Sequence, residues 1–185
     1  MASIDEKPGF VLWMTGLSGA GKTTIAKILE GELRARGLKV ERLDGDIIRQ
    51  NLTKDLGFTK EDRAANIERV TFVAKLLSRN GVACICSFIS PYQSIRDKVR
   101  METTNFLEVF IDADLESLIE RDVKGLYKKA IAGEIPNFTG ISDPYEPPEE
   151  PDIYIQTEGS TPLECANLIL EILEDRGLLP LPDLY

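Results

Sequence analysis

Apolar runs and amphipathic stretches alternate along most of the chain. Residues 9–15 and 82–88 are almost continuously apolar, a pattern typical of strands buried on both faces of a parallel sheet. After the first of these runs, apolar residues recur at helical spacing, which predicts a helix that ends at Gly37. The same criteria predict strands over 39–43, 106–111 and 153–156, and helices over 47–52, 59–80, 90–103, 114–121 and 161–176. This alternation predicts one α/β domain over 1–185, a three-layer sandwich with a five-stranded, mainly parallel sheet between helices.

The segment 122–151 interrupts the alternation with several glycines and prolines. Loops of this length are usually functional or disordered, and Tyr127, Phe138 and Tyr145 argue against plain disorder. We interpret the segment as a mobile lid or binding loop. Residues 178–185 form a tail that we expect to lie on the surface or to fray.

Composition narrows the range of functions. Lys and Arg total 22 and Asp and Glu 31, so the net charge is −9, and histidine is absent. This excludes Ser-His-Asp and Cys-His nucleophiles and histidine-ligated zinc. The acidic balance argues against non-specific nucleic-acid binding. The longest apolar runs reach about half of a membrane span, so we expect no membrane association.

The three cysteines, Cys84, Cys86 and Cys165, cannot all pair with one another. We expect buried thiols in a reducing cytoplasm, and a redox switch is the alternative, which nothing else in the sequence supports. Residues 1–7 are polar and too short for a signal peptide, which agrees with a cytoplasmic location.

A glycine-rich motif follows the first predicted strand. Residues 16–23, Gly-Leu-Ser-Gly-Ala-Gly-Lys-Thr, fit the pattern G-x-x-x-x-G-K-[ST] in full. Glycines let backbone amides curl around phosphate oxygens, and the following helix directs the positive end of its dipole at the same anion. Lys22 then reaches the β- and γ-phosphates, and the Thr23 hydroxyl coordinates Mg²⁺. The alternative, a turn that binds nothing, is far less frequent, so we predict a nucleoside triphosphate site of a GTPase, an ATPase or a small-molecule kinase.

Acidic and basic residues lie near the same edge of the sheet. Asp44 and Asp46 end the second strand, where ligands bind in open parallel sheets. We expect Asp44 near Mg²⁺ and the attacked hydroxyl, whereas Asp46 fits a helix cap equally well. Arg63, three residues before Asn66 on one helical face, suits phosphate or sulfate but also a surface salt bridge, and for Arg69 the salt bridge is favoured.

Two loop aromatics and one serine complete the candidates. Phe58 and Phe138 could stack on the two faces of a base, or pin their loops onto the core. Ser90 follows the third strand, but without histidine no evident base activates it. We therefore expect a backbone or hydroxyl contact to substrate at Ser90.

Together these segments resemble the adenylylsulfate kinase (APS kinase) family, from about residue 9 to 156 and in unchanged order. The most specific stretches are Asp-Gly-Asp at 44–46, Gly-Phe-Thr at 57–59, Lys-Gly-Leu-Tyr at 124–127 and Phe-Thr-Gly-Ile at 138–141. The others are 16–24, Arg49, 60–63 with Asn66, Ile-Ser-Pro-Tyr at 89–92, Arg121 and Asp-Pro-Tyr-Glu at 143–146.

The resemblance implies a P-loop kinase fold, usually a homodimer, that uses Mg-ATP to phosphorylate the 3′-hydroxyl of adenosine 5′-phosphosulfate (APS), giving PAPS and ADP. It implies catalytic roles for Lys22, Asp44 and Ser90, and metal contacts from Thr23 and Asp44. Ser90 matches a position labelled as phosphoserine in the family, but in-line transfer needs only positioning and charge neutralisation. The implied ATP contacts are Gly16, Leu17, Ser18, Gly19, Ala20, Gly21, Lys22, Thr23, Thr24 and Arg121. The implied APS contacts are Asp46, Arg49, Phe58, Arg63, Asn66, Ile89, Ser90, Lys124, Leu126 and Phe138.

The chain departs from the family pattern at two places. Pro136-Asn137 stands where many relatives have Lys-Gly, and Gln93 where many have Arg. Both changes remove positive charge, which we expect to weaken APS binding without abolishing chemistry. Two alternatives remain: a non-catalytic APS or PAPS sensor that regulates an attached ATP sulfurylase, and a P-loop kinase for another nucleotide or metabolite. The intact Lys22, Thr23 and Asp44 favour the enzyme.

Overall fold

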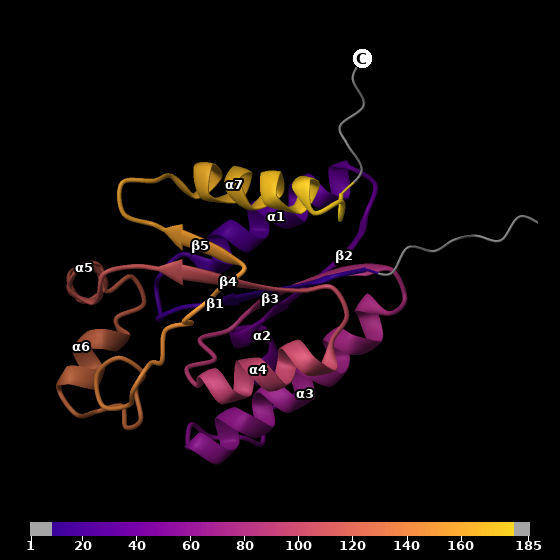
Figure 1. Ribbon diagram of the computed structural model, residues 1–185. Helices are drawn as coiled ribbons and strands as arrows, with labels where there is room; N and C mark the ends of the chain where they lie inside the picture. Colours follow the sequence, from indigo (N-terminus) through magenta and orange to yellow (C-terminus); the bar gives the residue numbers. More distant parts are fainter. Residues whose placement is uncertain (1–8, 180–185) are drawn as a thin grey trace, which may run out of the picture.

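A computed structural model describes residues 9–179, which build one parallel sheet between two layers of helices (Figure 1). The strands are β1 (Val11–Thr15), β2 (Lys39–Asp44), β3 (Val82–Ser87), β4 (Phe106–Asp112) and β5 (Ile153–Gln156), in the order β2-β3-β1-β4-β5. All four strand pairs are parallel. The predicted α/β class is confirmed, and the carboxyl ends of all five strands meet at one edge.

Helices cover both faces of the sheet. Figure 1 shows α1 (Lys22–Ala35) and α7 (Pro162–Asp175) on one face, and α3 (Lys60–Ser78) and α4 (Gln93–Glu102) on the other. Side chains alternate along β1, so Leu12 and Met14 pack under α1 and α7, whereas Val11 and Trp13 pack under α3 and α4. The short helices α2 (Gly45–Gln50), α5 (Leu115–Arg121) and α6 (Leu126–Ile131) lie toward the carboxyl edge.

Local capping chemistry sets several helix starts as predicted. The Thr161 side chain accepts from the backbone N–H of Glu164, whose carboxylate accepts in return from the Thr161 backbone, with Pro162 in the first turn. Thr59 and Asp114 cap α3 and α5 through their side chains. The prediction was wrong for α4, which begins at Gln93, because Ser90 has a φ of 39° that a right-handed helix cannot contain.

The lid segment 122–151 contains a helix that the pattern did not reveal. It is α6, which begins after Gly125 in the left-handed region and is only six residues long. The described helices include none long and apolar enough to cross a membrane. Of the C-terminal tail, Leu179 is buried against the core, and the predictions for 180–185 and for 1–7 lie outside the described residues.

Candidate active site

The glycine-rich loop runs from the end of β1 to the start of α1. Gly16 has a φ of 148°, and a Cβ there would lie 2.3 Å from the carbonyl oxygen of Ile111 on β4. Only glycine fits this close approach between the loop and the neighbouring strand. The loop therefore leaves the sheet edge in a fixed direction and presents its amides at the N-terminus of α1, which is suited to an anion.

Lys22 lies inside this loop. Its ammonium donates to the carbonyl oxygens of Gly16 (2.8 Å) and Leu17 (2.7 Å). Burial lowers the pKa of Lys22 to about 7, and the charge of Lys124 adds to this effect, whereas the carboxylates of Asp44 and Asp46 oppose it. A cation held so close to the loop amides can neutralise phosphate charge.

Thr23 and Asp44 meet where a magnesium ion would lie between the loop and β2. The Thr23 hydroxyl donates to Asp44 Oδ2 over 2.8 Å, and Asp44 Oδ1 accepts from the backbone N–H of Asp46. Hydroxyl and carboxylate oxygens are the hard ligands that Mg²⁺ prefers. No group of three or more metal-ligating residues occurs in the described part of the chain. The pair therefore fits an ion whose remaining ligands are phosphate and water oxygens.

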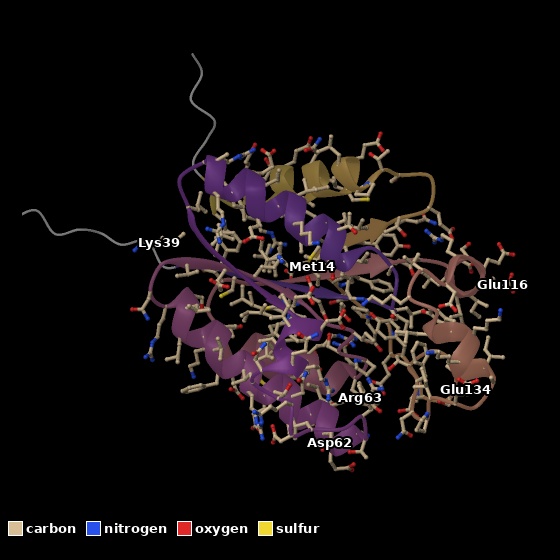
Figure 2. All side chains as sticks on the ribbon, turned by 180° about the vertical axis from the view of Figure 1, so that it is seen from behind. Met14, Lys39, Asp62, Arg63, Glu116 and Glu134 are labelled. Carbon is tan, nitrogen blue, oxygen red and sulfur yellow. The ribbon has the colours of Figure 1, made fainter. Side chains whose placement is uncertain are left out.

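A second cluster lies between α2, α3 and the lid. Two guanidinium groups lie over the Phe58 ring, that of Arg49 at 4.5 Å and that of Arg63 at 5.7 Å from its centroid. Arg63, which is labelled in Figure 2, also donates to the carbonyl oxygens of Phe58 and Asn137, and these bonds join α3 to the lid. Asn66 is buried one turn further, where it accepts from the Thr53 hydroxyl over 2.7 Å. This cluster of two cations and an exposed aromatic ring suits an anionic nucleotide.

The structure distinguishes Arg63 from Arg69, for each of which the sequence allowed either ligand binding or a salt bridge. Arg69 forms a two-pronged ion pair with Asp55 at 2.7 Å for each bond, as the salt-bridge interpretation predicted. Arg63 is buried and bonds to carbonyl oxygens, and no salt bridge is recorded for it among the described residues. Arg63 therefore belongs to the site cluster.

Lid residues approach both halves of the site. Phe138 packs edge-on against Tyr127, with ring centroids 5.2 Å apart, and the Tyr127 hydroxyl donates to the Ser18 carbonyl of the glycine-rich loop. Lys124 donates to Asp46 over 2.7 Å. A small hollow next to the loop is lined by Arg121, Lys124 and Leu126 together with Ser18 and Gly19. The lid thus contacts the glycine-rich loop and the first turn of α2, where Asp46 lies.

The turn after β3 completes the edge. The indole N–H of Trp13 donates to the Ser90 hydroxyl over 3.0 Å, and the Ile89 carbonyl accepts from Thr15 over 2.7 Å. Ser90 is 3% exposed, and among the described residues no carboxylate or amine that could act as a base bonds to its hydroxyl. A substrate contact at Ser90 stays a prediction.

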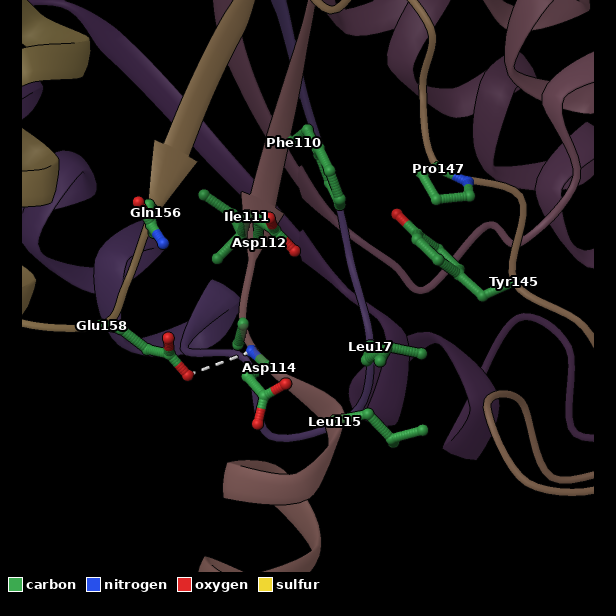
Figure 3. Close-up of a pocket in the computed structure, with 11 residues that line it drawn as sticks. Leu17, Phe110, Ile111, Asp112, Asp114, Leu115, Tyr145, Pro147, Gln156 and Glu158 are labelled. Atoms are coloured by element: carbon green, nitrogen blue, oxygen red, sulfur yellow. Dashed lines mark hydrogen bonds between the residues drawn. The ribbon is translucent and has the colours of Figure 1, made fainter.

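Sequence reasoning did not find a cavity of about 440 Å³ near this edge (Figure 3). It lies between the ends of β4 and β5 and the lid residues Tyr145 and Pro147. The Tyr145 hydroxyl lies 2.9 Å from the Thr15 hydroxyl, and burial raises the pKa of Tyr145 to about 12. Two acidic residues that line the cavity already accept hydrogen bonds: Asp112 from the Tyr154 hydroxyl, and Glu158 from the backbone N–H of Asp114.

A buried ion pair, Arg96–Glu108, was missed as well. The sequence does hold a signal for it, because Glu108 interrupts an apolar strand and a buried carboxylate requires a partner. Gln93, one of the two departures from the family pattern, bonds to Arg96 and Asp97 on its own helix.

A parallel sheet with a glycine-rich loop, a buried lysine, a paired threonine and aspartate, and a lid defines a P-loop kinase, an ATP-dependent phosphotransferase. The particular family follows from comparison with known proteins. The chain belongs to the adenylylsulphate kinase family, whose model matches residues 8–156.

Individual relatives agree with this assignment. A probable adenylyl-sulfate kinase of Pseudomonas aeruginosa is 72% identical over 89% of this chain and 77% of its own length. A solved Mycobacterium tuberculosis APS kinase in complex with AMPPNP and APS has a TM-score of 0.87 and 40% identity, covering 90% of this chain and 98% of that chain. A probable bifunctional SAT/APS kinase of Sorangium cellulosum is 55% identical over 93% of this chain and 30% of its own length.

Proposed function

We propose that the protein transfers the γ-phosphoryl group of Mg-ATP to the 3′-hydroxyl of adenosine 5′-phosphosulfate, giving PAPS and ADP in sulfate assimilation. The observation that carries the proposal is the meeting of two clusters at one sheet edge. The glycine-rich loop with Lys22 offers a triphosphate site. The cluster of Arg49, Phe58 and Arg63 offers a site for an anionic nucleotide.

On the donor side, the loop residues 16–24 hold the triphosphate through their amides. Lys22 leaves the carbonyl oxygens of Gly16 and Leu17 and neutralises charge on the transferred group. Thr23 and Asp44 hold Mg²⁺, which when bound screens the phosphate charge. Both Asp44 oxygens already accept hydrogen bonds, from Thr23 and from the Asp46 backbone, which favours metal holding over deprotonation of the acceptor hydroxyl. Arg121 lies beside the base of ATP.

On the acceptor side, Phe58 and Phe138 enclose the adenine, and Arg49, Arg63 and Asn66 hold the phosphosulfate and ribose. The turn at Ile89 and Ser90 supplies polar contacts. We propose that Lys124 exchanges its ion pair with Asp46 for the anionic acceptor when the lid of 122–151, with Leu126, closes. Transfer is in-line, so positioning and charge neutralisation suffice without a covalent intermediate at Ser90.

We further propose a cytoplasmic homodimer, with association with or fusion to an ATP sulfurylase as a second arrangement. The family resemblance supports the homodimer, and the bifunctional Sorangium relative supports the fusion. The net charge of −9 fits a small-molecule substrate better than nucleic acid. Analytical ultracentrifugation of the purified chain tests the dimer: a single species at 20.6 kDa would refute it.

The test of the reaction measures ADP release from Mg-ATP with APS, with AMP or no acceptor as controls, and identifies the product by mass. We expect ADP release only with APS, together with a product that carries one additional phosphoryl group. Tight APS or PAPS binding without turnover would instead support a sensor. Release with another acceptor and none with APS would refute the acceptor assignment.

A further inference from the structure

Arg96 on α4 is a fully buried cation outside the clusters described above. Its guanidinium donates to Glu108 Oε1 (2.7 Å), to the carbonyl oxygens of Ser90 (2.7 Å) and Glu146 (2.7 Å), and to Gln93 Oε1 (2.6 Å). These acceptors come from β4, the turn after β3, the end of the lid segment, and α4 itself. Only a planar guanidinium, with five N–H groups in a rigid fork, can serve so many directions at once.

The Ser90 turn needs such support. Ser90 has a φ of 39°, which costs free energy for a residue with a side chain. The turn is held on one side by Trp13, which donates to the Ser90 hydroxyl, and on the other by Arg96, which donates to the Ser90 carbonyl. The two bonds together fix the Ser90 side chain and the direction in which the Ser90–Pro91 peptide faces at the site edge.

The same guanidinium joins this turn to the lid. The Glu146 backbone N–H donates to the Pro91 carbonyl over 2.8 Å, and the Glu146 carboxylate accepts from the Gln93 backbone over 2.7 Å. Tyr145, one residue earlier, lies beside Thr15 at the end of β1. Arg96, which donates to the Ser90 and Glu146 carbonyl oxygens, therefore acts together with these bonds in setting the turn after β3 and the end of the lid segment relative to each other.

The Ser90 turn, which Arg96 holds, lies close to Asp44 of the candidate active site. β2 and β3 pair with Asp44 opposite Ser87, so the Ser90 turn begins just beyond the strand position that faces Asp44. We propose that Arg96 is a positioning residue for the acceptor: through the Ser90 carbonyl it aims the turn at the acceptor nucleotide, without touching either substrate. The expected effect on the KM for APS rests on the proposed function. The placement of the Ser90 turn by Arg96 does not.

Glu108 explains how a buried cation is tolerated. Its carboxylate is 4% exposed and pairs with Arg96 inside the protein, which compensates both charges. Arg100, one turn further along α4, reaches the same carboxylate from outside at 3.4 Å and pairs with Asp152 at 2.8 Å. In the part of the chain that the structure describes, Arg100 bonds neither to the Ser90 turn nor to residues 122–151, so it provides a matched control on the same helix with the same carboxylate partner.

The test compares Arg96→Lys with Arg100→Lys. A lysine at 96 keeps the charge beside Glu108 but cannot donate to the Ser90 and Glu146 carbonyls in the same fork. We expect the KM for APS to rise about tenfold in Arg96→Lys, the scale of one lost charge-assisted hydrogen bond, while the KM for ATP stays within about twofold. Arg100→Lys should leave both constants near the wild-type values.

A second readout does not depend on substrate. Trp13 is the only tryptophan of the chain, and its indole N–H is bonded to Ser90, so its fluorescence reports on the turn. We expect the emission of the substrate-free protein to shift in Arg96→Lys and not in Arg100→Lys. Gln93→Met, which removes one acceptor of Arg96 at a half-buried surface position, should give the same two effects more weakly and serves if Arg96→Lys does not fold.

The outcomes separate the two proposals. The absence of APS-dependent phosphoryl transfer in the wild type would refute the proposed function. The Trp13 emission would still decide the role of Arg96. An unchanged emission spectrum in Arg96→Lys would overturn the positioning role. Equal increases in KM for ATP and APS would also overturn it, because a general loosening of the fold does not distinguish the substrates.

Discussion

Phe58→Ala offers a direct test of the acceptor site, because the Phe58 ring does little for the fold. The ring is 57% exposed, and its recorded ring contacts are the guanidinium groups of Arg49 and Arg63. Exposed cation–π pairs contribute about 0.5–1 kcal/mol. We therefore expect the free energy of unfolding to fall by about 1 kcal/mol or less.

The effect on the acceptor should be larger than the effect on stability. Stacking of a base on an aromatic side chain is worth about 1–3 kcal/mol, which corresponds to a loss of acceptor affinity of about 5-fold to 150-fold. The donor site is built from residues 16–24 and does not include this ring, so the KM for ATP should change by less than about twofold.

Steady-state ADP release with varied APS or varied ATP measures both constants, and thermal unfolding measures stability. Phe72→Ala is the matched control, because Phe72 lies on the same helix as Arg63 and is 62% exposed, and within residues 9–179 no ring contact joins it to the site. An acceptor KM in Phe58→Ala within twofold of that in Phe72→Ala would refute the stacking role. Equal losses for ATP and APS would refute it too.

Three further predictions concern the donor site and the cysteines. Lys22→Met should remove most turnover, by about 100-fold or more, yet stabilise the fold at pH 7. The folded state binds the Lys22 proton less tightly (pKa about 7) than the unfolded chain (10.5). The free energy of unfolding of the wild type should therefore rise by up to about 1.4 kcal/mol per pH unit between about pH 7 and 8.5. An equally steep rise with pH in Lys22→Met, measured by denaturation at each pH, would contradict this. Thr23→Val should raise the Mg²⁺ concentration for half-maximal ADP release about tenfold, whereas Thr23→Ser should stay near wild type, and equal values for the two would remove Thr23 from the metal site. Burial raises the pKa of Cys84 to about 12 and also raises that of Cys86, so iodoacetamide at pH 8 should label them only after unfolding, and labelling of the folded chain at the rate of a free thiol would refute this.

Local signals predicted most of the fold. Thr161, Pro162 and Glu164 specify the start of α7 because every partner in the cap is within three residues. Buried strands such as β1 have apolar patterns that depend on their own residues alone. The helix α6 was missed because its six residues, Leu126–Ile131, are too few for a helical period to appear. The start of α4 was misplaced because Pro91 favours a first helical turn, while the distant Trp13 and Arg96 hold Ser90 outside the helix.

The same difference between local signals and contacts of distant residues explains which parts of the site could be predicted. The glycine-rich loop was predictable because its members are contiguous and each has a required backbone role. Glu108 within an apolar strand signals only that a buried carboxylate needs a partner. That Arg96 is this partner was not predictable, because the four acceptors of Arg96 come from separate parts of the chain, up to 50 residues away at Glu146. The pairing of Tyr145 with Thr15 spans 130 residues and has no sequence pattern. Contacts of this kind depend on how the strands are ordered in the sheet, which periodicity does not determine.

The two carbonyl oxygens that hold Lys22 have a consequence for how fast a nucleotide can be received. In most surface lysines, an incoming phosphate must first strip water from a strongly hydrated ammonium. In this loop the Lys22 ammonium is already out of water, and its hydrogen bonds are made with Gly16 and Leu17. The cost of dehydration is therefore incurred once, when the chain folds. Each catalytic cycle needs only an exchange of oxygen partners, from peptide carbonyl to phosphate and back, over the reach of one side chain.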